Sequence, residues 1–231
     1  MKIVKYISAT LGLLTLALLS QSVSAATSVS WTSPANGTSF FVGTEVMPTG
    51  NASAIGATSQ GLDLALVLDS SGSMTATQTV GGVTKTRQQW QKDAAIALVN
   101  NLPTTNVSVS VIEFDSDANT VRVLTPLSTN IASVISGINS VDASGGTDIA
   151  DGINEARVEL TSSRHTSGWS QQMVVFSDGD SFGASPSAAA LVAANAGIAV
   201  HSVALPGGNI STMESIALNG SGTFIDASTA T

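Results

Sequence analysis

An aspartate and two serines follow an apolar segment at a spacing that suits the binding of a hard metal ion. The run Leu64–Leu68 is apolar, and Asp69, Ser71 and Ser73 come directly after it. Gly72 permits a tight turn here, so one carboxylate and two hydroxyls can face the same side. The segment holds neither cysteine nor histidine. A set of oxygen ligands favours Mg²⁺, Mn²⁺ or Ca²⁺ over structural zinc, which prefers sulfur and nitrogen.

Two later segments of the chain supply oxygen ligands of the same kind. Thr147 follows two glycines and opens a predicted helix, and Asp178 follows an apolar segment at 173–176 and precedes Gly179. In open α/β sheets, ligands bind beyond the carboxyl ends of the strands, where the strand order reverses. The sequence therefore predicts that Thr147 and Asp178 lie at the same edge of a sheet as Asp69.

Apolar runs and helical periodicity alternate along most of the chain. Continuous or alternating apolar residues indicate strands at 64–68, 107–114, 121–124, 173–176, 198–205 and 223–225. Apolar residues at spacings of three and four indicate helices at 86–102, 131–138, 149–160, 188–196 and 213–218. This alternation predicts an α/β fold with a doubly wound, mostly parallel central sheet and helices on both faces.

The five oxygen ligands resemble the metal-ion-dependent adhesion site (MIDAS) of the von Willebrand factor type A (vWA) domain. That site is written D-x-S-x-S, followed by a distant Thr and a distant Asp. The matching residues are Asp69, Ser71, Ser73, Thr147 and Asp178. The resemblance covers about residues 61–227 and implies a Rossmann-like fold. It also implies that the serines and the threonine bind the ion directly, that the aspartates bind it directly or through water, and that one position stays open for a partner's carboxylate.

The first 25 residues have the pattern of a secretory signal peptide of the bacterial type. Lys2 and Lys5 precede an apolar run at 11–19, and residues 23–25 form a small-x-small cleavage site. The apolar run is too short for a membrane span. Cleavage takes the formal charge from −8 to −10, and the chain has no cysteine for disulfides. We expect an exported protein outside the cell, at its surface or in the periplasm, with no membrane insertion after cleavage.

Residues 26–60 are expected to form an N-terminal β extension and a linker. Strands are predicted at 29–32 and 40–42, and the small-residue stretch 50–60 is the predicted linker. The two strands resemble the opening of bacterial immunoglobulin-like domains. The vWA-like segment 61–231 is expected to lack the final helix of the family, which predicts that the natural product is longer.

Several other chemistries are disfavoured by the sequence. Phosphoryl transfer of the haloacid-dehalogenase type needs a second aspartate two residues after the first, where this chain has Ser71. A serine hydrolase needs an activating base, but His165 and His201 stand in a polar loop and a strand. The acidic charge disfavours nucleic acid and anionic membranes as partners. We expect the protein not to be an enzyme.

These observations predict an exported, divalent-metal-dependent binding domain for adhesion or assembly. Mg²⁺, or Mn²⁺ or Ca²⁺, would be held by the five ligands, and a Glu or Asp carboxylate of a partner protein or surface polymer would complete its coordination. The alternative is a structural module of a larger surface protein or filament, in which the metal only makes the loops rigid. Binding of an acidic partner that is lost in chelator would distinguish the two.

Overall fold

The computed structural model describes residues 26–33, 49–55 and 61–227. They fall into two compact units, one within Gln21–Ser59 and one within Gln60–Thr231. In the first unit, β1 (Ala26–Ser33) pairs antiparallel with β2 (Thr49–Ile55).

Three sequence-based predictions fall on this first unit, and the strand predicted at 29–32 lies within β1. The strand predicted at 40–42 and the signal peptide predicted at 1–25 lie outside the described residues. The stretch 50–60 is predicted as a linker, whereas Thr49–Ile55 forms β2. The strand propensity of its Gly, Ala and Ser residues is low, and the ladder with β1 supplies hydrogen bonds that propensity cannot indicate.

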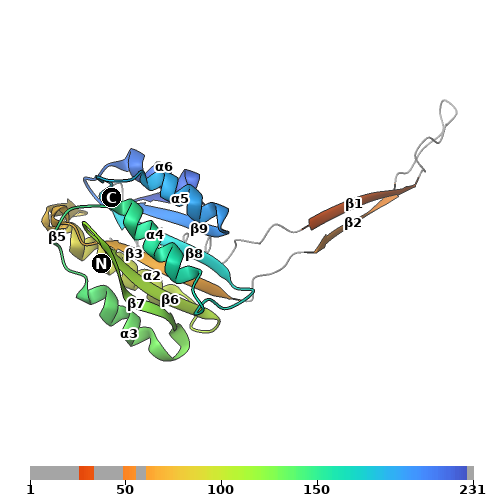
Figure 1. The fold of residues 1–231 in the computed structure, drawn as a ribbon, viewed down its shortest axis with the longest axis horizontal. Helices are drawn as coiled ribbons and strands as arrows, with labels where there is room; N and C mark the ends of the chain where they lie inside the picture. The colour runs from red at the N-terminus through yellow and green to blue at the C-terminus, as the bar shows by residue number, and fades with distance from the viewer. Residues whose placement is uncertain (1–25, 34–48, 56–60, 228–231) are drawn as a thin grey trace. The chain divides into compact units, whose positions relative to one another are not determined.

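The larger unit is built on a six-stranded sheet with the order β10-β9-β8-β3-β6-β7 (Figure 1). Its strands are β3 (Leu62–Asp69), β6 (Val107–Phe114), β7 (Ala118–Pro126), β8 (Ser170–Ser177), β9 (Ile198–Ala204) and β10 (Ser221–Asp226). Every neighbouring pair is parallel except β6 and β7. β3 is central and buried along its whole length. The predicted mostly parallel sheet is confirmed.

Helices cover both faces of this sheet, as Figure 1 shows. They are α2 (Arg87–Asn101), α3 (Leu127–Ser140), α4 (Ile149–Leu160), α5 (Pro186–Asn195) and α6 (Ile210–Asn219). The helix α2 begins at a capping box, in which Thr86 and Gln89 each accept a hydrogen bond from the other's backbone N–H. Each helix predicted from the sequence occurs in the structure. The ends of α4 agree with the prediction, and those of the other helices differ by a few residues. No helix in the described residues is long and apolar enough to span a membrane.

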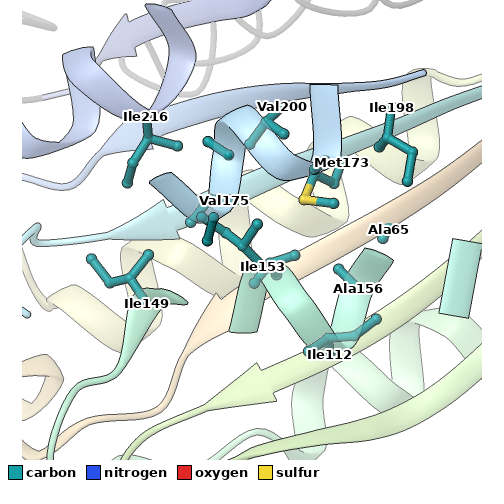
Figure 2. Packing of buried hydrophobic residues seen from close by; sticks show 14 of the residues in the cluster. Ala65, Ile112, Ile149, Ile153, Ala156, Met173, Val175, Ile198, Val200 and Ile216 are labelled. Carbon is teal, nitrogen blue, oxygen red and sulfur yellow. The ribbon is translucent and has the colours of Figure 1, made fainter. Parts of the chain in front are cut away.

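Alternating side chains of β3 pack into two separate hydrophobic clusters. Leu64, Leu66 and Leu68 contribute to a cluster with α2 and α3. Ala65 and Val67 contribute to the other, with α4, α5 and α6. Figure 2 shows this second cluster, in which α4 side chains such as Ile153 lie over the sheet. Because successive side chains of a strand point to opposite faces, the central strand holds both layers of helices in place.

One hairpin in the larger unit is not among the sequence predictions. After the short 3₁₀ turn η1 (Gly72–Thr75), β4 (Thr77–Val80) pairs antiparallel with β5 (Val83–Thr86). Gly81 and Gly82 make the connection with φ values of 54° and 80°. Two glycines between Thr- and Val-containing segments are a hairpin signal. The hairpin links the first ligand-bearing turn to α2.

Candidate metal centre

The candidate ligands lie at the carboxyl edge of the sheet, where its strand order reverses. Asp69 is the last residue of β3, and Asp178 directly follows β8, the parallel neighbour of β3. From β3 the chain passes to β6 on one side of the sheet, and it later continues through β8 and β9 on the other. Such a switch point is where open α/β sheets place their ligand sites.

Hydrogen bonds from the turn after β3 and from the end of β8 hold the two oxygens of Asp69. Its Oδ1 accepts the backbone N–H of Ser71 at 2.8 Å, and its Oδ2 accepts the hydroxyl of Ser177 at 2.6 Å. The hydroxyl oxygens of Ser71 and Ser73 lie 3.0 Å apart. The buried side chain of Gln91 brackets the Asp69 backbone, accepting from its N–H at 3.0 Å and donating to its carbonyl at 2.8 Å. The first ligand-bearing turn is therefore preorganised.

Asp69 carries its carboxylate in a place that disfavours charge. Burial raises the pKa of the Asp69 carboxyl from 3.8 to about 6, although hydrogen bonds from Ser177 and Ser71 lower it. The negative charge of Asp178 raises the pKa further. Asp178 directly follows Ser177, whose hydroxyl contacts Asp69, so the two carboxyls lie at the same end of neighbouring strands. A cation between or beside them would offset the cost of both charges.

Asp178 has one paired oxygen and one unpaired oxygen. Its Oδ2 lies 2.6 Å from Nη1 of Arg87, and its backbone carbonyl accepts the N–H of Asn209 at 2.5 Å. Among the described residues, no hydrogen-bond partner reaches the buried Oδ1 of Asp178. A buried carboxylate oxygen without a partner is unfavourable. This atom is therefore well suited to face a bound cation.

Backbone hydrogen bonds tie the Thr147 segment to both of the other loops. The carbonyl of Gly145 accepts the N–H of Gly72 at 3.2 Å, and the carbonyl of Thr147 accepts the N–H of Phe182 at 2.9 Å. Gly145 has a φ of +76°, and a Cβ there would lie 2.5 Å from Oδ2 of Asp115. Only glycine fits this close approach without strain. The Thr147 segment thus joins the site through its backbone.

The residues present fit a hard divalent cation. Two carboxylates and three hydroxyls are available, and Asp69, Ser71, Ser73 and Asp178 are linked by direct contacts or by charge. In the part of the chain that the structure describes, no group of three or more His, Cys, Asp or Glu side chains could hold a metal. The candidate set therefore relies on hydroxyl oxygens as well as carboxylates, which suits Mg²⁺ better than zinc.

Three further residues of the site are absent from the sequence predictions: Ser177, Gln91 and Arg87. Ser177 and Gln91 give no signal because polar residues at the ends of strands and in helices are common. Arg87 does give one, since it is the first residue of α2. A positive charge at a helix N-terminus opposes the helix dipole, so its placement there indicates a contact elsewhere.

Comparisons with known proteins bear on the fold and the family. A family model described as von Willebrand factor type A domain matches residues 64–181. BatB from Bacteroides thetaiotaomicron is similar in structure, with a TM-score of 0.62 and 24% identity over 72% of this chain and 90% of that one. The aerotolerance-related membrane protein from Bacteroides fragilis gives 0.63 and 24% over 74% and 93%. Among curated proteins, none matches this chain significantly in sequence.

A more distant structural neighbour contains a metal. Proximal thread matrix protein 1 from the mussel byssus, described with a zinc-occupied MIDAS motif, has a TM-score of 0.59 and 22% identity. The match covers 72% of this chain and 41% of that protein. Identities at this level establish the shared fold.

Proposed function

The chain belongs to the von Willebrand factor type A domain family, and from this premise we propose that it is a divalent-metal-dependent protein-binding domain. Asp69, Ser71, Ser73, Thr147 and Asp178 would hold the ion. A Glu or Asp carboxylate from another protein, or from a surface polymer, would take the open coordination position. We propose that the protein acts after export, in adhesion or assembly, and that it has no enzymatic activity.

One observation carries this proposal: the buried Oδ1 of Asp178 has no partner among the described residues. It stands beside a second carboxyl, Asp69, whose burial and neighbouring charge raise its pKa to about 6. Two buried carboxyls at one edge of the sheet, one of them with an unpaired oxygen, would be stabilised by a bound cation. The zinc-occupied MIDAS of the mussel protein is consistent with metal at this place in the fold.

Each group of the chain has a distinct part in the proposed binding. The bound ion supplies positive charge and an open coordination position. Ser177 and the backbone of Ser71 hold the Asp69 carboxylate in one orientation. Gln91 fixes the backbone of Asp69, and Arg87 fixes Asp178. With few direct carboxylates around it, the ion keeps excess positive charge and attracts an external anion.

Metal titration of three forms of the protein tests the proposal. We expect the wild type to bind Mg²⁺ or Mn²⁺ in calorimetry and then to bind an acidic partner from the native cell envelope. Asp69→Ala is expected to lose the metal and the partner while it keeps the fold, because Asp69 lies at a strand end. Asp117→Asn is the matched control, since it neutralises an exposed carboxylate in a neighbouring loop.

Two outcomes would count against adhesion. If metal raises the melting temperature but no anionic partner binds in its presence, the structural alternative is favoured, in which the ion only makes the loops of a larger assembly rigid. If the wild type binds no divalent ion at all, the metal site itself is wrong.

A further inference from the structure

Arg87 joins the proposed metal ligands to the loop behind them. Its Nη1 lies 2.6 Å from Oδ2 of Asp178 and 3.5 Å from the carbonyl oxygen of Ser73. Its Nε and Nη2 donate to the carbonyls of Pro206 and Gly207 at 3.1 Å and 2.6 Å. The side chain is only 13% exposed. The guanidinium is therefore held in place from several sides and stays beside Asp178.

This position changes the charge of the site. Asp69 and Asp178 each contribute a negative charge when ionised, and Arg87 contributes a positive one, because a guanidinium stays protonated in proteins. The three side chains together are singly negative. A divalent ion makes the loaded site singly positive, whereas the same ion with the two aspartates alone would make it neutral. The other acids of these loops, such as Asp148 and Asp180, are more exposed, so water and salt screen them better.

We propose that Arg87 is a specificity-determining residue, which keeps net positive charge on the metal-loaded site and thereby makes it select an anionic partner group. This inference rests on the metal site of the proposed function. The same residue opposes metal binding, since a fixed positive charge beside Asp178 repels the incoming ion. Arg87 therefore exchanges some metal affinity for a stronger pull on the carboxylate of the partner.

The alternative role for Arg87 is purely geometric, and it predicts a change of the opposite sign. If the guanidinium only holds Asp178 and the loop at Pro206 and Gly207 in place, its loss loosens the ligands and weakens metal binding. If its charge decides, its loss strengthens metal binding and weakens anion binding. The sign of the change in metal affinity therefore separates the two roles.

The experiment compares the wild type with Arg87→Gln, Arg87→Lys and Lys85→Gln at pH 8. Mn²⁺ affinity is measured from free Mn²⁺ by electron paramagnetic resonance, and acetate affinity from the relaxation of water on bound Mn²⁺. Lys85→Gln is the matched control, because Lys85 pairs with Asp93 and stacks on Trp90, and its removal deletes a neighbouring positive charge that does not contact Asp178. Thermal unfolding of each variant without metal checks that it folds.

We expect Arg87→Gln to bind Mn²⁺ about tenfold more tightly and acetate about tenfold more weakly than the wild type. The Mn²⁺ and acetate affinities of Arg87→Lys should lie between those of the wild type and Arg87→Gln, because lysine keeps the charge but lacks the forked donors of the guanidinium. Lys85→Gln should match the wild type in both measurements.

Four results would overturn the inference. Weaker Mn²⁺ binding by Arg87→Gln would show that geometry decides. An equal loss of acetate binding in Arg87→Lys and Arg87→Gln would show that the charge of residue 87 does not decide. A wild type that binds Mn²⁺ but not acetate would overturn this inference and leave the metal site standing, whereas a wild type that binds no Mn²⁺ would overturn both.

Discussion

Asp69 has to remain ionised for metal binding in a place that disfavours its charge. It is fully buried at the end of β3, and Asp178 lies close enough to repel it. Its hydrogen bonds from Ser71 and Ser177 orient the carboxylate but do not compensate for burial, since the pKa remains raised to about 6. The residue is thus arranged for binding a cation at the expense of the stability of the metal-free protein.

Asp69→Asn is therefore expected to stabilise the metal-free protein. An acid whose pKa is raised on folding contributes stability below its unfolded pKa of 3.8 and loses it as the pH rises through about 6. At pH 8 the variant should exceed the metal-free wild type by roughly 1–3 kcal/mol, and near pH 4 the two should be about equal. Urea unfolding at both pH values, in chelator, measures this. A variant that is less stable than the wild type at pH 8 would refute the argument.

Gly145 sets the approach between the Thr147 segment and the neighbouring loop. Gly145→Ala would place a Cβ within 2.5 Å of the Asp115 carboxylate at a φ of +76°. We expect a loss of about 1–3 kcal/mol in stability and a several-fold loss in Mg²⁺ affinity, because the loop must move. Gly168→Ala is the control, since Gly168 has a φ of +83° but nothing within 4 Å of the added Cβ. The control variant should lose stability but keep the Mg²⁺ affinity of the wild type. Equal Mg²⁺ affinities in the two variants would mean that this loop does not shape the site.

At the scale of elements, periodicity predicts the sheet and its helices well because each element buries one or two apolar faces. Leu64–Leu68 is apolar throughout and becomes the central strand, and the apolar spacing of 149–160 predicts α4 to the residue. The hairpin β4–β5 is missed because its strands are short and mostly exposed, so they carry little apolar pattern. Its turn glycines, Gly81 and Gly82, were the available signal.

In the candidate site too, some residues are predicted by a local sequence pattern, and others are found only from the folded structure. The five candidate ligand positions, which remain a prediction, come from a spaced motif and from the strand ends that carry it. Arg87, Gln91 and Ser177 contact the aspartates from other elements, and each contact spans more than 20 residues of sequence. Such pairings depend on the tertiary arrangement, so local patterns in one sequence do not reveal them.

A buried glutamate of α4, Glu159, connects this helix to the edge strand β7 and to the loop after α4. Glu159 accepts two hydrogen bonds from the guanidinium of Arg164 and one from the backbone N–H of Leu124 in β7. Burial raises the pKa of Glu159, but the hydrogen bonds from Arg164 and Leu124 outweigh it, so the pKa lies below 4.5. The ionised form is therefore the stabilising one.

Glu159→Gln is expected to destabilise the protein by about 2 kcal/mol at pH 7. An acid with a lowered pKa contributes stability above its unfolded pKa and loses it as the pH falls through the folded value. The difference between variant and wild type should therefore shrink in acid, below the ordinary pKa of 4.5. Denaturant unfolding across this pH range measures the difference in stability. Metal affinity should stay unchanged, because Glu159 lies in the last turn of α4, at the opposite end of the helix from Thr147. A difference that grows in acid would contradict the argument.

At the scale of the whole molecule, the proposed ion would link three loops that come from separate parts of the chain. Hydrogen bonds already join the turn after β3 to the Thr147 segment, as from Gly72 to Gly145, and that segment to the loop after β8, as from Phe182 to Thr147. Two buried carboxyls lie between them. An ion bound there would stabilise the folded state and not the unfolded one, because the ligands come together only on folding.

Stability should therefore rise with the logarithm of Mg²⁺ concentration. Once Mg²⁺ exceeds its dissociation constant, each tenfold increase should add ~1.4 kcal/mol to the free energy of unfolding. Chelator should reverse the effect, and Asp69→Ala should show no dependence on Mg²⁺. Thermal unfolding in a Mg²⁺ series at constant ionic strength measures this, because added salt by itself would screen the acidic surface of a chain with formal charge −8. A slope in Asp69→Ala equal to that of the wild type would place the stabilising ion elsewhere on the molecule, away from the buried carboxyls at the ends of β3 and β8.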